Sequence, residues 1–518
     1  MTNLKSLILG SAAGLIAIGG AQAADLPVKA KAVEYVKVCS LYGAGFYYIP
    51  GTDTCIKIGG AIRLDTAFNG GTYDVPFWQG GAGGNNLFTK DYITTRERIN
   101  LTTDTRTATE YGVVRTYANI QFDFLQNRES IAGGYTEVDY AFIQFAGFTF
   151  GKAVSQFDPQ WALAKPYISS GFNAGSNNAT GIPQIAYTAS FGNGVSATIS
   201  LENASAYRNA GLWNTDTLIV GPGAGTFLPN FYGSASNTFL GNAYGGNHIP
   251  DVVGNLRLDQ AWGSLHFAAA MHQISPTFYA TAAGGTGNQT LGHADDSYGF
   301  AVTGAVEFKT LPTGAGDSLK LEATYAKGAA KYVFGGTTDT SGGGRYSKVD
   351  GNTIGFGYVL DGVYNNGGQI IQSEAWQVSA FYEHYWNPAW RTSIFGNYSH
   401  ISYGDGNAAM LAAFGGVGVT GGPGANNSTT TTTPARAGVF AGTGNFDLGL
   451  AQIGTRTAWT PVRNLTLSAQ FTYSRLEQNL NGTYTTAAGG MTGNAAGTVY
   501  QTSNQNLYNG SVQILRSF

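Results

Sequence analysis

The chain has 518 residues, including 75 Gly, 30 Tyr and 29 Phe, whereas Lys, Arg, Asp and Glu together make up only 11%. A soluble protein usually carries about 25% of those four charged types. The mean hydropathy of −0.09 is near neutral, which disfavours a bundle of apolar membrane helices. Few charges, neutral hydropathy and many aromatics favour a surface divided between a lipid-facing side and a water-facing side.

The first 23 residues have the pattern of a secretory signal peptide. Lys5 precedes an apolar run at 7–18, and small residues follow at 21–23. That run is too short and too interrupted by Gly to cross about 30 Å of hydrocarbon as a helix. We therefore expect a signal peptide at 1–23 and one mature domain at 24–518, which begins with Ala24.

Charge and cysteine content fit an exported protein. Without Lys5 the chain has 27 basic and 31 acidic residues, a net charge of −4, which gives no indication of nucleic-acid binding. Cys39 and Cys55 are the two cysteines, and an oxidising compartment favours a disulfide between them. Such a bridge would close a loop of about 15 residues and contribute on the order of 3 kcal/mol. A metal pair or a reactive thiol is the alternative, but no His lies nearby.

Alternation of apolar and polar residues recurs along the chain and predicts β-strands. It is clearest at 195–202, 319–325 and 465–474. A soluble sandwich would show the same alternation, so the number and spacing of the segments must decide. We predict sixteen strands, at 57–68, 92–104, 110–124, 135–145, 148–153, 183–191, 195–202, 251–261, 264–274, 297–308, 318–328, 374–386, 390–401, 446–459, 465–477 and 505–518.

Connections between these strands alternate between short and long. The short ones include 105–109, 146–147, 192–194, 262–263, 387–388 and 460–464. The long ones lie at about 69–91, 203–250, 329–373, 402–445 and 478–504 and are rich in Gly, Asn, Ser and Thr, and the run 428–433 within one of them indicates flexible exterior. An even strand count with this asymmetry predicts an all-β fold, a 16-stranded antiparallel transmembrane β-barrel with short periplasmic turns and long exterior loops. Sixteen strands leave an aqueous lumen.

Four arginines have the parity of lumen-facing positions. Arg63 alternates with Ile62 and Leu64, which face outward. By the same alternation, the other three arginines also face inward. Like charges on neighbouring strands repel each other unless water or carboxylates lie between them. Rings of charge set selectivity in channels. We therefore predict that these residues line a constriction, with hydrated lumen residues as the alternative: Arg63, Arg96, Arg98 and Arg115.

Nothing in the sequence predicts an enzyme or a cofactor. Six histidines show no metal-like clustering, and the Gly-rich segment 221–225 lacks the strand–turn–helix context of a phosphate-binding loop. We expect a passive channel for ions and small hydrophilic molecules. A substrate-specific channel or surface receptor is the main alternative. A soluble secreted β-protein is disfavoured by the turn asymmetry and by the lack of short tandem repeats.

Several segments resemble the outer-membrane porins of alphaproteobacteria, of the rhizobial and brucella type. They are ADLPVKA at 24–30, VCSLYGAGFYYIPG at 38–51, DTCIKIGG at 53–60, FTFGKA at 148–153 and YEHYW at 382–386. The N-terminal block with its two cysteines is the most specific of these. The resemblance implies a sixteen-stranded barrel in the outer membrane, a homotrimer, and diffusion of small hydrophilic solutes.

The resemblance also implies two functional segments. Phe518 ends the chain as an assembly signal for the barrel-assembly machinery, although Arg516 stands where an aromatic residue is usual. In trimeric porins the third exterior loop folds into the lumen, and here that loop is about 154–182. We therefore expect Asp158 of this loop to face the four arginines across the constriction.

Overall fold

The computed structural model describes residues 37–69, 92–125, 135–168, 175, 180–205, 210–216, 243–279, 288–335, 345–414, 438–486 and 498–518. The expected signal peptide and Ala24 lie outside these residues.

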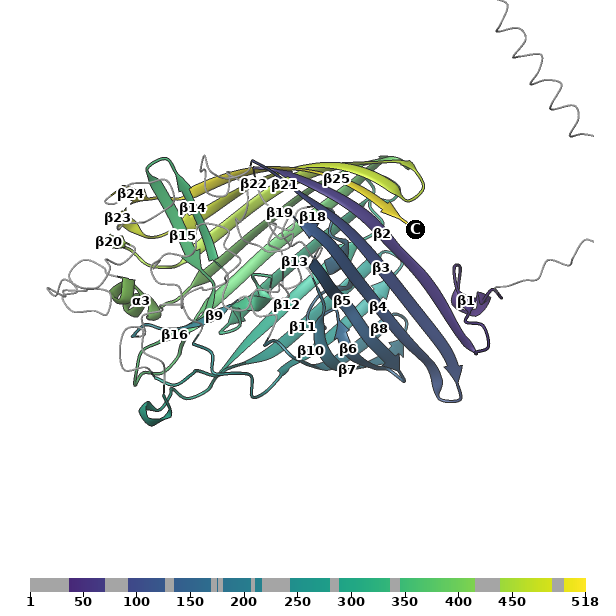
Figure 1. Ribbon diagram of the computed structural model, residues 1–518, viewed down its shortest axis with the longest axis horizontal. Coiled ribbons are helices and arrows are strands. Elements are labelled where there is room, and N and C mark those ends of the chain that lie inside the picture. The colour runs from purple at the N-terminus through teal and green to yellow at the C-terminus, as the bar shows by residue number, and fades with distance from the viewer. Residues whose placement is uncertain are drawn as a thin grey trace, which may run out of the picture.

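Sixteen long antiparallel strands among the described residues form one closed barrel (Figure 1). Each strand pairs with its neighbours in chain order, and the last strand returns to the first. The barrel strands are β2 (Thr54–Phe68), β3 (Ile93–Thr109), β4 (Gly112–Leu125), β5 (Tyr135–Phe145), β6 (Phe148–Ala153), β7 (Ile182–Gly192), β8 (Val195–Glu202), β10 (Asp251–Gln260), β11 (Gly263–Ile274), β12 (Ser297–Phe308), β13 (Ser318–Lys327), β18 (Glu374–Asn387), β19 (Trp390–Ser402), β21 (Leu448–Val462), β22 (Leu465–Gln478) and β25 (Gln505–Ser517).

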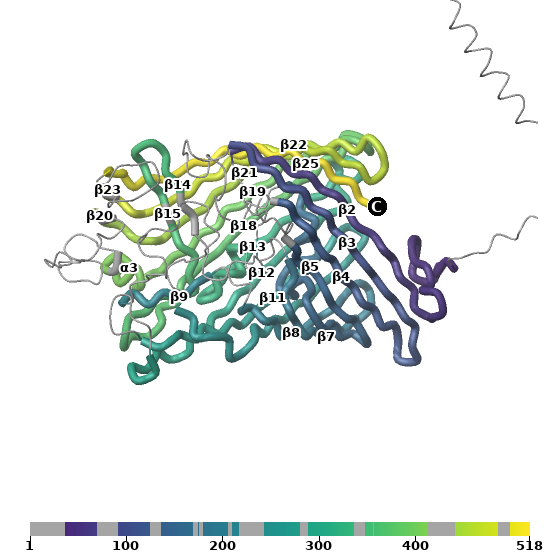
Figure 2. Tube along the Cα trace, in the orientation of Figure 1, coloured from purple at the N-terminus to yellow at the C-terminus, as the bar shows by residue number. Residues whose placement is uncertain are grey.

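The barrel closes where β2 meets β25. The register runs from Ala61 opposite Ser517 to Phe68 opposite Gly510, and Figure 2 shows the purple start of the barrel beside its yellow end. Phe518 extends this pairing, because its N–H donates to the Gly60 carbonyl (3.0 Å) and its own carbonyl accepts from the Gly60 N–H (3.2 Å). A Cβ at Gly60 would lie 2.9 Å from the Phe518 ring, so glycine allows this close packing.

The sixteen strand predictions are confirmed, with two turns misplaced. The segment 105–109 belongs to β3, which continues to Thr109, and β21 continues to Val462 through part of the predicted turn 460–464. Threonine explains both errors, because it is polar but β-branched and pairs readily across strands. The hydroxyls of Thr392 and Thr457, 3.1 Å apart, form one such pair.

Short connections join alternate strands at one end of the barrel, here called the turn end; most are two-residue turns, and 309–317 joins β12 to β13. Ala146 (φ 49°) with Gly147, and Asn193 (φ 49°) with Gly194, adopt left-handed conformations. Two left-handed residues match the twist of antiparallel strands and so permit a tight hairpin. The other end of the barrel, the loop end, carries the long connections.

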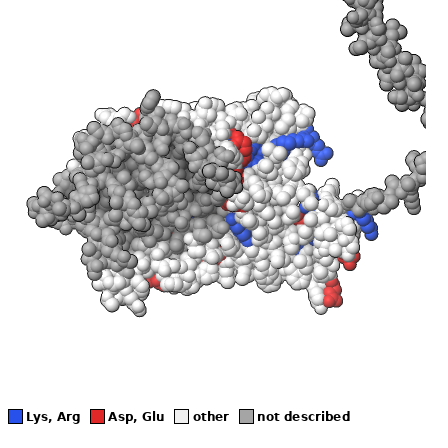
Figure 3. Space-filling model, viewed as in Figure 1, with Lys and Arg blue, Asp and Glu red and all other residues white. Residues whose placement is uncertain are grey.

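Large apolar side chains cover the outside of the barrel. Ile199, Phe267, Ile394 and Ile453 are each more than half exposed, and they alternate with buried inward neighbours. In Figure 3 few charged atoms appear on the described barrel surface in this view. No helix among the described residues is both long and apolar enough to span a bilayer.

Two further sheets lie at the loop end. One contains β14 (Arg345–Asp350), β15 (Thr353–Tyr358), β24 (Val499–Thr502), β23 (Asn481–Thr486) and β20 (Gly438–Thr443). The other contains β17 (Ile371–Gln372), β16 (Leu360–Tyr364) and β9 (Gly211–Asn214), and helix α3 (Gly406–Phe414) lies beyond β19. The run 428–433, which the sequence indicates to be flexible exterior, lies outside the described residues. The short strand β1 (Tyr47–Tyr48) pairs with β2 at the turn end.

Candidate functional site

The connection between β6 and β7, residues 154–181, is here called the internal loop, and its described residues 154–168 lie inside the barrel. Glu202 on β8 fixes its start, since a carboxylate oxygen accepts from Ser155 Oγ at 2.7 Å. Farther along, Lys320 Nζ on β13 donates to the Ala164 carbonyl (2.8 Å). Its described residues thus follow the inner wall, held by side chains from strands far apart around the barrel.

Residues 166–168 of the internal loop continue along the inner face of the barrel, past β19 and β22, to β2. Ser393 Oγ on β19 donates to the Pro166 carbonyl (2.8 Å). The Ile168 N–H donates to Gln470 Oε1 on β22 (2.6 Å), and the Ile168 carbonyl accepts from Arg63 on β2. Four of these bonds join backbone atoms of the loop to wall side chains, so they fix its path.

Aromatic packing adds to these hydrogen bonds. Trp161 and Tyr167 of the internal loop contact the lumen-facing rings of Phe381 and Phe395, with centroids 5.6–6.0 Å apart. Phe381 and Phe395 face the lumen, and exposing two such large apolar rings to water would cost free energy. Their burial shows why the loop lies against β18 and β19.

Arg63 and Arg96 share one carboxylate. Asp65 on β2 lies 2.7 Å from Arg63 Nε and 2.8 Å from Arg96 Nη2. The side chain of Arg96 is only 2% exposed, whereas that of Arg63 is 21% exposed. Arg63 is therefore the member of this group that meets both the lumen and the internal loop.

Arg98 belongs to a separate neutral pair. Its Nε and Nη2 each lie 2.6 Å from an oxygen of Asp123 on β4, which is the fork-to-fork geometry of a strong arginine–carboxylate pair. Both side chains are buried. Carboxylates thus separate the neighbouring arginines, as the sequence led us to expect.

Arg115 lies away from this group, toward the turn end. It pairs with Asp104 (2.9 Å), which also pairs with Arg106 (3.2 Å). Arg106 is eight positions beyond Arg98 on β3, or roughly 26 Å along the strand. Arg106, and Arg115 opposite it in the strand register, therefore lie closer to the turn end than Arg98 does. The role of the four arginines in a constriction stays a prediction.

Asp158 lies in a turn of the internal loop. Its N–H donates to the Ser155 carbonyl at 3.1 Å, and its side chain is 6% exposed. Arg63 instead contacts the loop through the Ile168 carbonyl. The expected role of Asp158 opposite the arginines stays a prediction.

Two further groups at the turn end repeat the arrangement of Asp65 and Asp104. Glu307 on β12 lies between Lys309 (3.3 Å) and Lys320 (3.7 Å). Glu383 on β18 lies between Arg391 (3.6 Å) and Arg456 (2.7 Å). We call each set of two cations around one carboxylate a cation triad. The alternation within 297–308 and 374–386 could have indicated that both carboxylates face inward. It could not indicate their partners, because three of the four cations lie on other strands of the barrel.

The two cysteines form the expected disulfide, with Cα atoms 6.0 Å apart. Both are buried together with Phe46 in a small cluster at the turn end. The guanidinium of Arg106 lies over the rings of Tyr42 and Phe46, at 5.5 and 5.0 Å. The disulfide segment thus packs beside the Asp104 triad.

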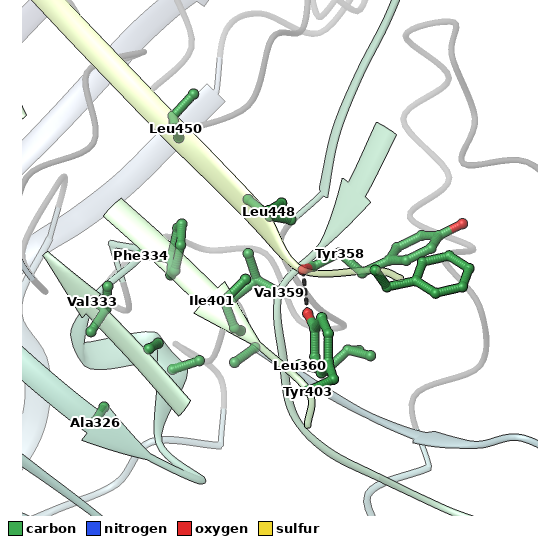
Figure 4. Close-up of a cluster of buried hydrophobic side chains, with 14 of the residues drawn as sticks. Ala326, Val333, Phe334, Tyr358, Val359, Leu360, Ile401, Tyr403, Leu448 and Leu450 are labelled. Carbon is green, nitrogen blue, oxygen red and sulfur yellow. Dashed lines mark hydrogen bonds between the residues drawn. The ribbon is translucent and has the colours of Figure 1, made fainter. Parts of the chain in front are cut away.

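Aromatic and aliphatic side chains fill much of the loop end (Figure 4). Inward residues of the barrel, such as Ile401 and Leu450, meet Phe334 and Tyr358 from the long connections. The Tyr403 hydroxyl donates to the Tyr358 carbonyl, as the dashed line shows. These strands therefore have an apolar lumen face at the loop end.

A buried ionic group also ties one long connection to the barrel wall. Asp251 on β10 lies 2.8 Å from Lys331 Nζ and 2.7 Å from His272 Nδ1. Asp361 on β16 accepts from the Ala330 N–H (2.6 Å). No group of three or more potential metal-ligating His, Cys, Asp or Glu residues occurs in the described part of the chain.

Comparisons with known proteins agree with this architecture. A family model described as a porin subfamily matches residues 25–510. The porin Omp2b of Brucella suis is 32% identical over 284 residues, which cover 52% of this chain and 67% of that protein. Omp2b of Brucella abortus (strain 2308) is 31% identical over 294 residues, 54% of this chain and 69% of that protein.

Among solved structures, the outer membrane channel DcaP of Acinetobacter baumannii has a TM-score of 0.55 to this chain. It is 14% identical and covers 91% of this chain and 99% of its own. At that identity the likeness concerns the fold alone. The family match, the relatives and the closed sixteen-stranded barrel lead to one conclusion: the chain belongs to the porin family of alphaproteobacterial outer membranes and is an outer-membrane porin channel.

Proposed function

We propose that the chain is a passive, water-filled channel for ions and small hydrophilic molecules, without catalytic activity. Its narrowest part would lie between the internal loop and the wall formed by β2, β3 and β4. The observation that carries this proposal is the path of the internal loop, which is bonded inside the barrel from Glu202 to Arg63. A fixed loop across a polar lumen narrows the water path without closing it.

Polar side chains on β3 and β4 support a hydrated path beside that loop. Asn100 and Asn119 are partly exposed and hydrogen-bonded to each other (3.2 Å), and Asn119 also donates to Asp139 (3.0 Å). Arg63, Arg96 and Arg98 would line this side, and Asp158 would contribute negative charge from the loop. Arg115 would act nearer the periplasm, at the turn end.

Planar-bilayer conductance tests the proposal. The purified protein should give stepwise, ohmic ion currents that a small neutral sugar does not block saturably. Saturable block of the ion current at low sugar concentration would favour the alternative, a substrate-specific channel. An absence of current from correctly folded protein would contradict both.

We also propose a homotrimer whose contact surface includes the outward face of β3. Among described residues, exposed aromatics such as Phe191, Trp386 and Trp390 mark the periplasmic membrane boundary on other strands. The corresponding face of β3 has Thr103 and Thr105 instead. Glu97 lies on the same outward face beside Leu64 and Phe124. A carboxylate there is better accommodated by a neighbouring subunit than by lipid.

We further propose that residues 1–23 are removed on export and that Phe518 helps the barrel-assembly machinery recognise the chain. Intact mass of the purified protein tests the first point, with a mature start at Ala24 as the expected result. Replacement of Phe518 by Ala should reduce the amount of folded barrel in outer membranes, and an unchanged amount would remove the assembly role.

A further inference from the structure

We propose that the periplasmic half of the lumen binds small oxyanions, such as inorganic phosphate and carboxylates, through three cation triads. The triads are centred on Asp104, Glu307 and Glu383. The inference rests on the proposed function as an open channel and adds the chemical class of solute that the channel concentrates.

The first triad is formed by β3 and β4. Asp104 lies 2.9 Å from Arg115 and 3.2 Å from Arg106, and each arginine side chain is 30% exposed. Arg115 is further oriented by Gln144, whose Oε1 accepts from Nη1 at 3.0 Å. The pairing holds both guanidinium groups at the wall while leaving part of each in contact with the lumen.

The second and third triads are neighbours on β12, β13, β18, β19 and β21. Lys309 beside Glu307 is 50% exposed, and Arg391 beside Glu383 is 21% exposed. Arg456, the second cation beside Glu383, is 12% exposed. This wall therefore presents cations to the lumen chiefly through Lys309 and Arg391.

These two walls face each other. In a barrel of sixteen strands, strands eight places apart lie on opposite sides, and β12 and β13 stand eight places from β3 and β4 in the strand order. Each triad has two cations and one carboxylate, so each carries a net charge of +1 when all three groups are ionised. A solute at this level passes between two positive walls.

Arginine is suited to hold oxyanions because its planar donors match the oxygens of carboxylate and phosphate. Opposed positive walls with low-dielectric surroundings also raise the local concentration of anions. One cation would neutralise each carboxylate, so the second cation leaves the excess charge that attracts a solute anion.

Farther from the turn end the balance of charge differs, because Glu202 and Glu322 are buried carboxylates there, with Lys165 of the internal loop near Glu322. The internal loop also reaches the triad wall, where Lys320 and Ser393 donate to its Ala164 and Pro166 carbonyls. The excess of positive charge is therefore largest on the periplasmic side. Phosphate should act more strongly from that side.

The test removes one cation from each wall and leaves every carboxylate a partner. In R115Q/R391Q, Asp104 keeps Arg106 and Glu383 keeps Arg456. Reversal potentials are measured in a KCl gradient near 0.1 M. The chloride-to-potassium permeability ratio should fall about twofold or more, because the field of a charge extends about 10 Å at that salt concentration. Partial block by inorganic phosphate added on the periplasmic side should weaken in parallel.

The matched control is R475Q/R516Q, which removes two outward-facing arginines and so the same charge from outside the lumen. It should behave as the wild type. The converse variant D104N adds net positive charge and should raise the ratio, and it decides the matter if R115Q/R391Q does not assemble. The difference should vanish near 1 M salt, where screening extends only about 3 Å.

Unchanged selectivity and phosphate block in assembled R115Q/R391Q, or an unchanged ratio in D104N, would overturn the inference while leaving the proposed channel intact. If wild-type protein carries no current at all, the proposed function itself fails and this inference fails with it.

Discussion

Arg63 of the barrel wall and Ile168 of the internal loop are joined by a hydrogen bond, with Nη2 3.3 Å from the carbonyl oxygen across 105 residues of sequence. Arg63 also pairs with Asp65, which holds Arg96 from the other side. The same side chain thus belongs to the charged wall and to the support of the loop. This double role makes Arg63 the most informative position for substitution.

Replacing Arg63 with Gln should increase single-channel conductance and shift selectivity toward cations. The change removes one lumen cation and one anchor of the internal loop, while Asp65 keeps Arg96 and the Gln513 amide (2.9 Å) as partners. Conductance and reversal potential in bilayers check both effects. R475Q, with the same charge change on the outer face, is the control. Wild-type values for both quantities in R63Q would place the constriction elsewhere.

Replacing Glu97 with Leu should weaken the trimer. If Glu97 meets a neighbouring subunit, the substitution removes polar contacts there and lowers the temperature at which trimers separate on a gel. If Glu97 faces lipid, E97L removes an unfavourable carboxylate and the trimer is unchanged or more stable. Ile199→Ala, on the outward face of a distant strand, provides a comparison. A more stable E97L trimer would exclude this face as the contact.

Replacing Asp317 with Asn should destabilise the barrel at neutral pH and reduce its sensitivity to acid. Asp317 is fully buried in the turn between β12 and β13 and accepts hydrogen bonds from Thr313 (2.6 Å), His384 (2.8 Å) and the Tyr385 N–H (2.9 Å). Burial raises the pKa of Asp317, but these hydrogen bonds outweigh it and hold the pKa below the ordinary value of 3.8.

Because the folded pKa is the lower one, the stabilisation from Asp317 is complete above about pH 4 and is lost as pH falls through the folded pKa. The unfolding temperature, measured by gel mobility after heating, should be lower in D317N at pH 7. The gap to wild type should narrow below pH 4. D53N, at an exposed turn, should match wild type throughout. A gap that stays constant with pH would show that ionisation of Asp317 does not contribute.

Replacing Phe334 with Ala should loosen the packed loop end. Phe334 is fully buried among residues from several long connections, and removing such a ring costs roughly 3–5 kcal/mol. Proteolysis of the exterior segments in intact membranes should become faster, while the strands stay protected. Phe191→Ala, where the ring is 66% exposed, serves as the control. Equal proteolysis of F334A and wild type would mean that this cluster does not stabilise the exterior segments.

The barrel could be predicted from sequence because the outward and inward faces of each strand require different residue types, which alternate along the chain. An outward apolar residue and an inward polar one alternate along β22, for example, so Leu467 and Ser468 alone indicate their environments. The parity of Arg63 and Arg98 could be predicted in the same way. Their heights in the barrel could be inferred only once the pairing of β3 with its neighbours was known.

The packed loop end could not be predicted in this way. Trp213, Phe334 and Tyr358 lie in apolar runs of only a few residues within connections otherwise rich in Gly, Asn and Thr, and such short runs show no period. Their burial depends on contacts between connections far apart in the chain, which local composition does not reveal. The triads of Glu307 and Glu383 were missed for the same reason, because Lys320 and Arg456 reach them from other strands.

We expect water to fill the lumen beside β3. The chain has two cysteines, both in the disulfide, so a single added cysteine can be labelled without background. Asn100 faces the lumen, and Leu101 beside it faces outward and is 39% exposed. A charged methanethiosulfonate reagent should lower single-channel conductance stepwise in Asn100→Cys and leave it unchanged in Leu101→Cys. Unchanged conductance in labelled Asn100→Cys, or an equal fall in both variants, would contradict the account.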